Sequence, residues 1–119
     1  MDTNHKTDKA CIEKILKYMN DIRTCISHFN IDSFEVLQDK RLAQLAITQS
    51  ITNIHEVKRL IDEDVLDKMP TFAGIKLSAA RNIASHDYEN VNFRIIYDVC
   101  KKLTASDITE ELENEYNNL

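Results

Sequence analysis

The hydrophobic residues among the first thirty positions recur at every third or fourth residue, which is the period of an α-helix. This stripe comprises Ile12, Ile15, Leu16, Met19, Ile22, Ile26 and Phe29. Because such spacing places the side chains along one side of a helix, it predicts a first helix over about 7–29. Asp32 and Ser33 favour turns and helix starts, so they predict a connector with a short helical turn over 33–37.

A longer run with helical spacing predicts a second helix over about 39–67. Its apolar positions are Leu42, Leu45, Ala46, Ile47, Ile51, Ile54, Val57, Leu60, Ile61 and Val65. They cover a wide arc of the helix surface, so more than one side of this helix must be buried. We therefore expect it to lie centrally in a bundle and also to form a homodimer with a second copy of the chain.

Pro70 cannot continue the second helix and predicts its end. Thr71 is then expected to cap a third helix, which should fail around 85–87, where short polar side chains compete for the backbone. Asn92 is expected to cap a fourth helix, and the acidic residues 106–119 to form a final helix or tail. Inward positions of the third helix are Phe72, Ile75, Ala79, Ala80 and Ile83. The predicted fold is all-α, an up-down bundle of four to five helices.

Composition agrees with this pattern and limits the type of protein. The 119 residues fit a single domain, 1–119, with residues 1–6 expected to be disordered. One glycine and one proline are too few for a fold with many tight hairpins. Three cysteines without a CxxC spacing argue against a disulfide framework and a structural zinc site. No apolar run approaches a membrane span, so we expect a cytoplasmic protein without membrane partners.

The charge is distributed unevenly along the chain. Net charge is −5, which by itself disfavours nucleic-acid binding. The segment 106–119 holds five of the twenty acidic residues and no base, so residues 1–105 carry fifteen of each sign. Within 71–105 five bases face three acids, and a local positive surface is therefore compatible with the sequence.

The stretch "RNIASHDY", residues 81–88, gathers polar chemistry inside a segment that otherwise needs only to pack. On a continuous helix Arg81 and His86 would be about 7.5 Å apart in rise and roughly 140° apart in rotation. They can share a site if the helix ends near Ser85. Histidine moves protons near neutral pH, and arginine holds phosphate oxygens bidentately. From the residues alone, catalysis and a surface pair or helix cap both remain open.

The longer stretch "RNIASHDYENVNFRIIYDV" resembles the signature of the HEPN superfamily, whose ribonuclease members carry Arg, four to six variable residues and His. Asn82 after the arginine and Tyr88 two residues after the histidine resemble the HepT-like branch. The similarity extends upstream through "QSITNIHEVKRL" and "MPTFAGIKLSAARN", and covers about residues 9–116. Asp87 departs from the commoner pattern, in which a small residue follows the histidine.

The resemblance implies a HEPN homodimer in which both copies of Arg81 and His86 line a shared cleft. It implies a metal-independent endoribonuclease that uses the 2′-hydroxyl of RNA, needs no cofactor, and leaves a 2′,3′-cyclic phosphate. Asn82, Ser85 and Glu56 would be supporting residues; Glu56 matches the glutamate of the family's long helix, bracing either the interface or Arg81. The family's toxins are paired with a minimal, MntA-like nucleotidyltransferase antitoxin that transfers AMP to the motif tyrosine, here Tyr88.

Two other functions remain compatible with the sequence: a non-catalytic HEPN module that binds a nucleotidyltransferase, and a purely structural helical dimer. Without the family, Tyr88 would be taken as a packing residue. His55 and Glu56 are adjacent and point to different sides of a helix, so they predict no metal pair. Gln49 and Asn53, four residues apart, fit either a buried polar pair across the dimer or an exposed pair.

Overall fold

The computed structural model describes residues 5–78 and 92–119, and in these two stretches the chain is helical without any strand. The long helices are α1 (His5–His28), α3 (Arg41–Lys58), α7 (Phe93–Leu103) and α8 (Ser106–Asn118). Short helices α2 (Phe34–Gln38), α4 (Glu63–Leu66) and α5 (Pro70–Ala73) lie in the connections. The predicted all-α bundle is confirmed. No helix of the described stretches is both long and apolar enough to cross a bilayer.

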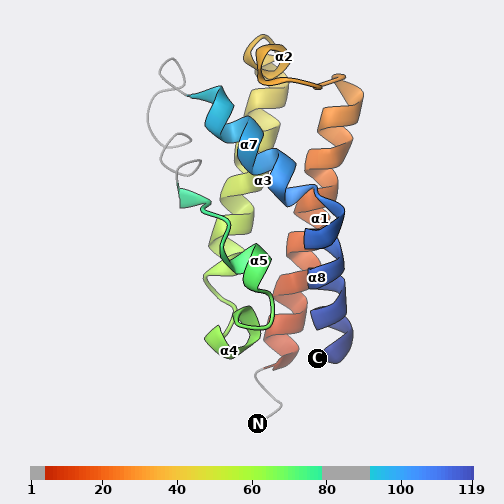
Figure 1. Cartoon of the computed structure of the whole chain (residues 1–119), viewed down its shortest axis with the longest axis vertical. Coiled ribbons are helices and arrows are strands. Elements are labelled where there is room, and N and C mark those ends of the chain that lie inside the picture. The colour runs from red at the N-terminus through yellow and green to blue at the C-terminus, as the bar shows by residue number, and fades with distance from the viewer. Residues whose placement is uncertain (1–4, 79–91) are drawn as a thin grey trace.

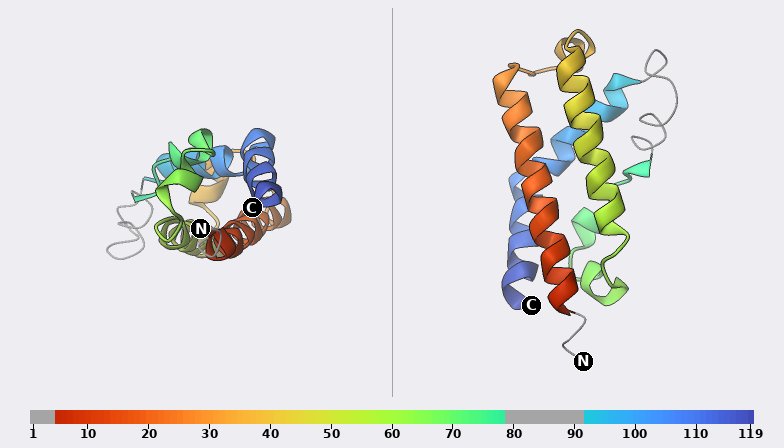
Figure 2. Two further views of the ribbon diagram at one scale, coloured as in Figure 1. Left: turned by 90° about the horizontal axis from the view of Figure 1, so that it is seen from below. Right: turned by 180° about the vertical axis from the view of Figure 1, so that it is seen from behind.

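The bundle is elongated, with extents of 48 × 27 × 19 Å. Helices α1 and α3 run antiparallel along its length and are joined at one end by α2 (Figure 1). Helix α8 lies beside α1. Helix α7, which precedes α8 in the sequence, crosses the bundle obliquely. The view from behind places α4 at the end of the bundle that also holds both termini, and α5 lies further from that end (Figures 1 and 2).

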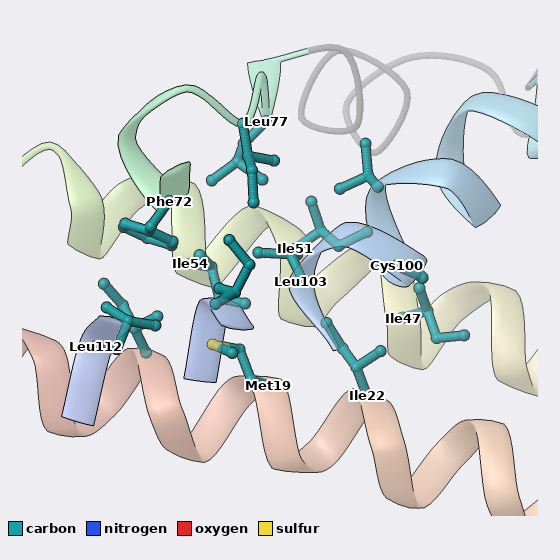
Figure 3. Close-up of a cluster of buried hydrophobic side chains, with 14 of the residues drawn as sticks. Met19, Ile22, Ile47, Ile51, Ile54, Phe72, Leu77, Cys100, Leu103 and Leu112 are labelled. Carbon is teal, nitrogen blue, oxygen red and sulfur yellow. The ribbon is translucent and has the colours of Figure 1, made fainter. Parts of the chain in front are cut away.

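One hydrophobic core joins all the long helices (Figure 3). Helix α1 contributes Met19 and Ile22, and α3 contributes Ile47, Ile51 and Ile54. Phe72, Leu77, Cys100, Leu103 and Leu112 complete the cluster from α5, the chain after it, α7 and α8. The predicted stripe of the first helix is largely buried, with Leu16, Ile26 and Phe29 at its margin.

The ends of α1 and α2 follow the predicted pattern closely. Helix α1 begins at His5, two residues before the expected start, so residues 5 and 6 of the segment expected to be disordered are helical. Residues 1–4 lie outside the described part of the chain. Helix α2 is the predicted short turn, and the Ser33 hydroxyl accepts a hydrogen bond from the backbone N–H of Val36, at 3.4 Å.

The second long helix is shorter than predicted, because α3 ends at Lys58 rather than near Asp67. The backbone N–H of Asp62 donates to the buried Asp8 carboxylate of α1, at 3.0 Å, instead of continuing the helical ladder. Asp62 then has extended dihedral angles and starts α4. Glu63 and Asp64 thereby occupy a helix's first turn, where acidic side chains are favourable.

The predicted third helix is also divided. Helix α5 starts with Pro70 at its first position, so Thr71 lies within the helix and is not its cap. The helix ends after one turn at Gly74, and residues 75–77 are not helical. Phe72 and Ile75 are buried as predicted, whereas Ala79, Ala80 and Ile83 lie outside the described residues.

The last two helices are confirmed with their boundaries. The Asn92 side chain caps α7 by accepting the backbone N–H of Arg94 at 3.0 Å. Arg23 of α1 fixes the junction between α7 and α8, because its guanidinium donates to the Thr109 hydroxyl and, at 3.5 Å, to the Thr104 carbonyl. The acidic helix predicted over 106–119 is α8.

Candidate functional site

Most of the predicted site residues fall in one segment of the chain. Arg81, Asn82, Ser85, His86 and Tyr88 lie within 79–91, outside the described residues, as does Asp87. Their roles, including the predicted helix end near Ser85, stay predictions. The described chain nevertheless holds Glu56 and both ends from which this segment departs.

Glu56 lies near the C-terminal end of α3, where its carboxylate forms an ion pair with Arg59 at 3.5 Å. Its side chain is about half exposed. At 100° per residue, Glu56 projects on the same side of α3 as Leu42, Leu45 and Gln49. The glutamate predicted to support the site therefore shares one helix side with the apolar residues predicted to form the dimer.

That outer side of α3 is apolar at its start and polar towards its end. Leu42 is 70% exposed and Leu45 is 38% exposed, although the opposite side of the same helix is buried in the core. Gln49 donates to the Asn53 side chain at 2.9 Å on the exposed surface, so the two form a pair within one chain. The sequence predicts that two sides of this helix are buried. Within a single chain only the inner side of α3 is buried. We call Leu42, Leu45, Ala46 and Gln49 the outer face of α3.

The chain that leads into the motif is held by a lysine from α3. The Lys58 ammonium donates to the carbonyls of Ala73, at 2.9 Å, and Ile75, at 3.1 Å. It is also 3.5 Å from the Phe72 carbonyl and lies over the Phe72 ring, 5.2 Å from its centroid. Burial lowers the pKa of Lys58 from its ordinary value. The Lys58 ammonium therefore supplies hydrogen-bond donors to the carbonyl groups at the C-terminal end of α5.

The opposite end of α5 is held by an acidic residue of α8. The two oxygens of Glu111 accept the backbone N–H groups of Thr71, at 3.2 Å, and Phe72, at 2.7 Å. These are N–H groups that a short helix leaves without a helical partner. A carboxylate at the N-terminus and an ammonium at the C-terminus both complement the dipole of α5.

The chain that follows the motif is attached at α7. Beyond the Asn92 cap, the Arg94 guanidinium lies 3.9 Å from the centroid of the Phe34 ring. One turn later the Tyr97 hydroxyl donates to the Asp32 carbonyl at 2.8 Å. The motif segment is thus bounded by two anchored stretches, one on α3 and α8 and the other on the α1–α2 connection.

An open groove lies next to the start of the motif segment, between 74–76 and α7. It has a volume of about 490 Å³, and Ile75, Val99 and Ile95 give it an apolar surface. Lys76 and Lys102 line it together with Asp98. The groove therefore carries two lysines and one aspartate beside residues 74–76, which precede in the sequence the segment predicted to bind phosphate.

Neither a metal nor a cysteine nucleophile is supported by the described residues. In 5–78 and 92–119, no three His, Cys, Asp or Glu side chains are arranged so that they could hold a metal ion. Cys11, Cys25 and Cys100 are free and buried. Burial raises the pKa of all three thiols, that of Cys100 to about 12, so they are protonated at neutral pH.

Comparison with known proteins decides the family. The family model of ribonuclease HepT-like proteins matches residues 10–115, nearly the whole chain. The chain belongs to the HepT-like ribonuclease family. A relative from Methanocaldococcus jannaschii, named "Putative RNase MJ0127", is 30% identical over 105 residues, which cover 88% of this chain and 84% of the relative. No solved structure matches the chain. The resemblance seen in the sequence motifs is confirmed at the level of the family.

Sequence reasoning missed Lys58 and Glu111, although the signal was present. Lys58 follows Ile47, Ile51 and Ile54 at spacings of four, three and four, so it continues the buried stripe of α3. Glu111 is one residue before Leu112 and three after Ile108, again on the buried side of its helix. A charged residue within an apolar stripe indicates a specific polar partner inside the fold.

Proposed function

We propose that this HepT-like protein is a metal-independent endoribonuclease of a toxin–antitoxin pair. The observation that carries the proposal is the family match over residues 10–115 together with the Arg-x4-His spacing of Arg81 and His86. Arg81 holds the scissile phosphate, and His86 moves the protons. The 2′-oxygen of RNA attacks the phosphorus as its proton leaves. The departing 5′-oxygen takes up a proton, giving a 2′,3′-cyclic phosphate and a 5′-hydroxyl end.

The proposed active form is a homodimer. Support comes from the outer face of α3, where Leu42 and Leu45 remain exposed in the single chain. Such side chains are stabilised by contact with a second copy of the same face. Glu56, on the same side of α3, then lies near the dimer axis, where it braces the interface or the two copies of Arg81.

Cleavage of a labelled RNA in EDTA tests the activity. Wild-type protein is expected to release fragments with 2′,3′-cyclic phosphate ends, whereas Arg81→Ala and His86→Ala are each expected to lower the rate by at least about 100-fold. Circular dichroism of both variants controls for folding. Unchanged cleavage by both variants would contradict the proposed catalytic pair, and absence of wild-type cleavage would favour the non-catalytic binding module.

The proposed partner is a minimal nucleotidyltransferase that transfers AMP from ATP to the Tyr88 hydroxyl with release of pyrophosphate. The added phosphate is anionic and would be attached two residues after His86 in the sequence, so it would repel the RNA phosphate from the proposed catalytic pair. Intact mass after co-expression with such a neighbour is expected to rise by one or more AMP units. The gain should disappear in Tyr88→Phe; its persistence in that variant would place the modification elsewhere.

A further inference from the structure

The short helix α5 lies a few residues before the motif segment in the sequence, and it would not be stable as a helix by itself. It has four residues, too few for a stable isolated helix. Its position depends on the buried Phe72 ring and on the two charged side chains at its ends, Glu111 and Lys58. These two charged contacts join α5 to α8 and α3, respectively.

Lys58 is the contact that reaches furthest towards the motif. Its last acceptor, the Ile75 carbonyl, belongs to the residue six positions before Arg81. Residues 75–77 are not helical, so no helical ladder fixes them. The lysine bonds therefore connect the C-terminal end of α3 directly to the chain from which the motif segment departs. Glu56, the predicted supporting residue, lies two positions earlier on the same helix.

A lysine at position 58 contributes less to stability than a well-packed apolar side chain would, because its charge is partly buried. Its ammonium is partly withdrawn from water, and burial opposes the charged form. Ile47, Ile51 and Ile54, earlier in the same stripe, are fully buried apolar residues. An apolar side chain at position 58 would continue this packing, but it could not bind three carbonyl groups at once.

We propose that Lys58 is a positioning residue for the ribonuclease site. By binding the Ala73 and Ile75 carbonyls, Lys58 fixes the chain that precedes Arg81. It thereby determines the position of the phosphate-binding arginine. This inference rests on the proposed ribonuclease function. Lys58 itself touches backbone carbonyls and takes no part in proton transfer.

The test compares Lys58→Met with two controls in the full-length protein. Methionine keeps an unbranched side chain, one atom shorter than that of lysine, and removes its donors. Lys68→Met makes the same change at an exposed lysine between α4 and α5. Ile22→Val, in the core far along the chain from the motif, provides a variant with a modest loss of stability and no effect on the lysine contacts.

Steady-state RNA cleavage is measured at a temperature where every variant is folded. Lys58→Met is expected to lower kcat about tenfold or more with KM nearly unchanged, because misplaced catalytic groups bind substrate but react slowly. Both control variants are expected to keep the wild-type kcat. A wild-type kcat in folded Lys58→Met would overturn the proposal, as would an equal loss in Ile22→Val.

Hydrogen exchange supplies a readout that does not depend on activity. Amides of peptides covering 79–91 are expected to exchange several-fold faster in Lys58→Met than in wild type, Lys68→Met or Ile22→Val. If wild-type protein cleaves no RNA, the proposed function fails by itself, and exchange still tests the lysine. Unchanged exchange in Lys58→Met would show that this side chain does not position the segment.

Discussion

Single charged side chains bind backbone groups beside the ends of helices in this protein. Asp8 accepts the backbone N–H of Asp62 just beyond the end of the second long helix, while Lys58 binds the carbonyls that an extended α5 would have used. Both side chains act on backbone groups distant in sequence. We therefore expect their removal to cost more stability than the removal of exposed surface charges.

Removing the Asp8 carboxylate should expose this role. Asp8→Ala removes the hydrogen bond from the Asp62 N–H to a carboxylate, and hydrogen bonds to charged groups contribute about 1.5–3 kcal/mol. We expect the free energy of unfolding in urea to fall by this amount. Asp21→Ala, at an exposed position of the same helix, should change it by less than about 0.5 kcal/mol. Equal effects of the two substitutions would contradict the assignment.

Cys100 predicts a pH dependence whose sign is fixed by burial. Its pKa is about 12 in the folded chain against 9.0 ordinarily, so between these values the unfolded state loses the thiol proton first. The stabilising contribution is complete below pH 9.0 and declines as pH rises, by at most about 1.4 kcal/mol per pH unit. Unfolding free energies of wild type and Cys100→Ala, measured from pH 8 to 10.5, should show the steeper alkaline decline in wild type. Parallel curves would refute this expectation.

At the scale of elements, α5 is stable only because its neighbours complete it. Helix α8 supplies acceptors for its first N–H groups, α3 supplies a cation for its last carbonyls, and the core receives Phe72. The longer α7 instead begins with its own cap, Asn92. The short helix that precedes the motif segment thus depends on tertiary contacts at both of its ends.

Glu111→Ala measures this dependence. The substitution removes the acceptors of two N–H groups and a favourable charge at the start of α5, a loss comparable with that of a helix cap, about 1–2 kcal/mol. Thermal unfolding should show a lower midpoint than in wild type. Glu113→Ala removes an exposed carboxylate two residues later on the same helix and should have little effect. A similar loss in both variants would mean that the charge of α8, rather than the contact with α5, is responsible.

At the scale of the whole molecule, the long helix α3 has one side in the core and the opposite side at the surface of the chain. Its inner side joins the core, and its outer face presents Leu42 and Leu45 at the surface of the single chain. Glu56 continues this side towards its C-terminal end. In the proposed dimer, the same helix would connect the core, the subunit contact and the catalytic segment.

Introducing charge on the outer face should therefore separate the proposed dimer. In a symmetric interface each substitution acts twice, and losing the burial of one leucine costs about 1.5–3 kcal/mol. We expect Leu42→Glu combined with Leu45→Glu to weaken dimerisation by at least about 100-fold in sedimentation equilibrium, and RNA cleavage to fall with it. Asn117→Glu combined with Asn118→Glu, at exposed positions of α8, adds two carboxylates away from α3 and is the control. An unchanged dimer in the double variant would place the interface elsewhere.

The sequence by itself determined the helical class, the family and most helix starts that depend on local chemistry. Period and caps are properties of neighbouring residues, so the buried stripe of α1, the Ser33 turn and the Asn92 cap were predictable. Tertiary structure decided where α3 and α5 end. The Asp8 carboxylate meets the Asp62 backbone across 54 residues, and Lys58 meets Ile75 across 17. A charge within an apolar stripe indicates that a partner exists, but no local pattern says which distant group it is. The motif residues 81–88 were found from their residue types, their spacing and their resemblance to the HepT-like signature, whereas the contacts that hold the preceding chain appeared only when α3, α5 and α8 were assembled.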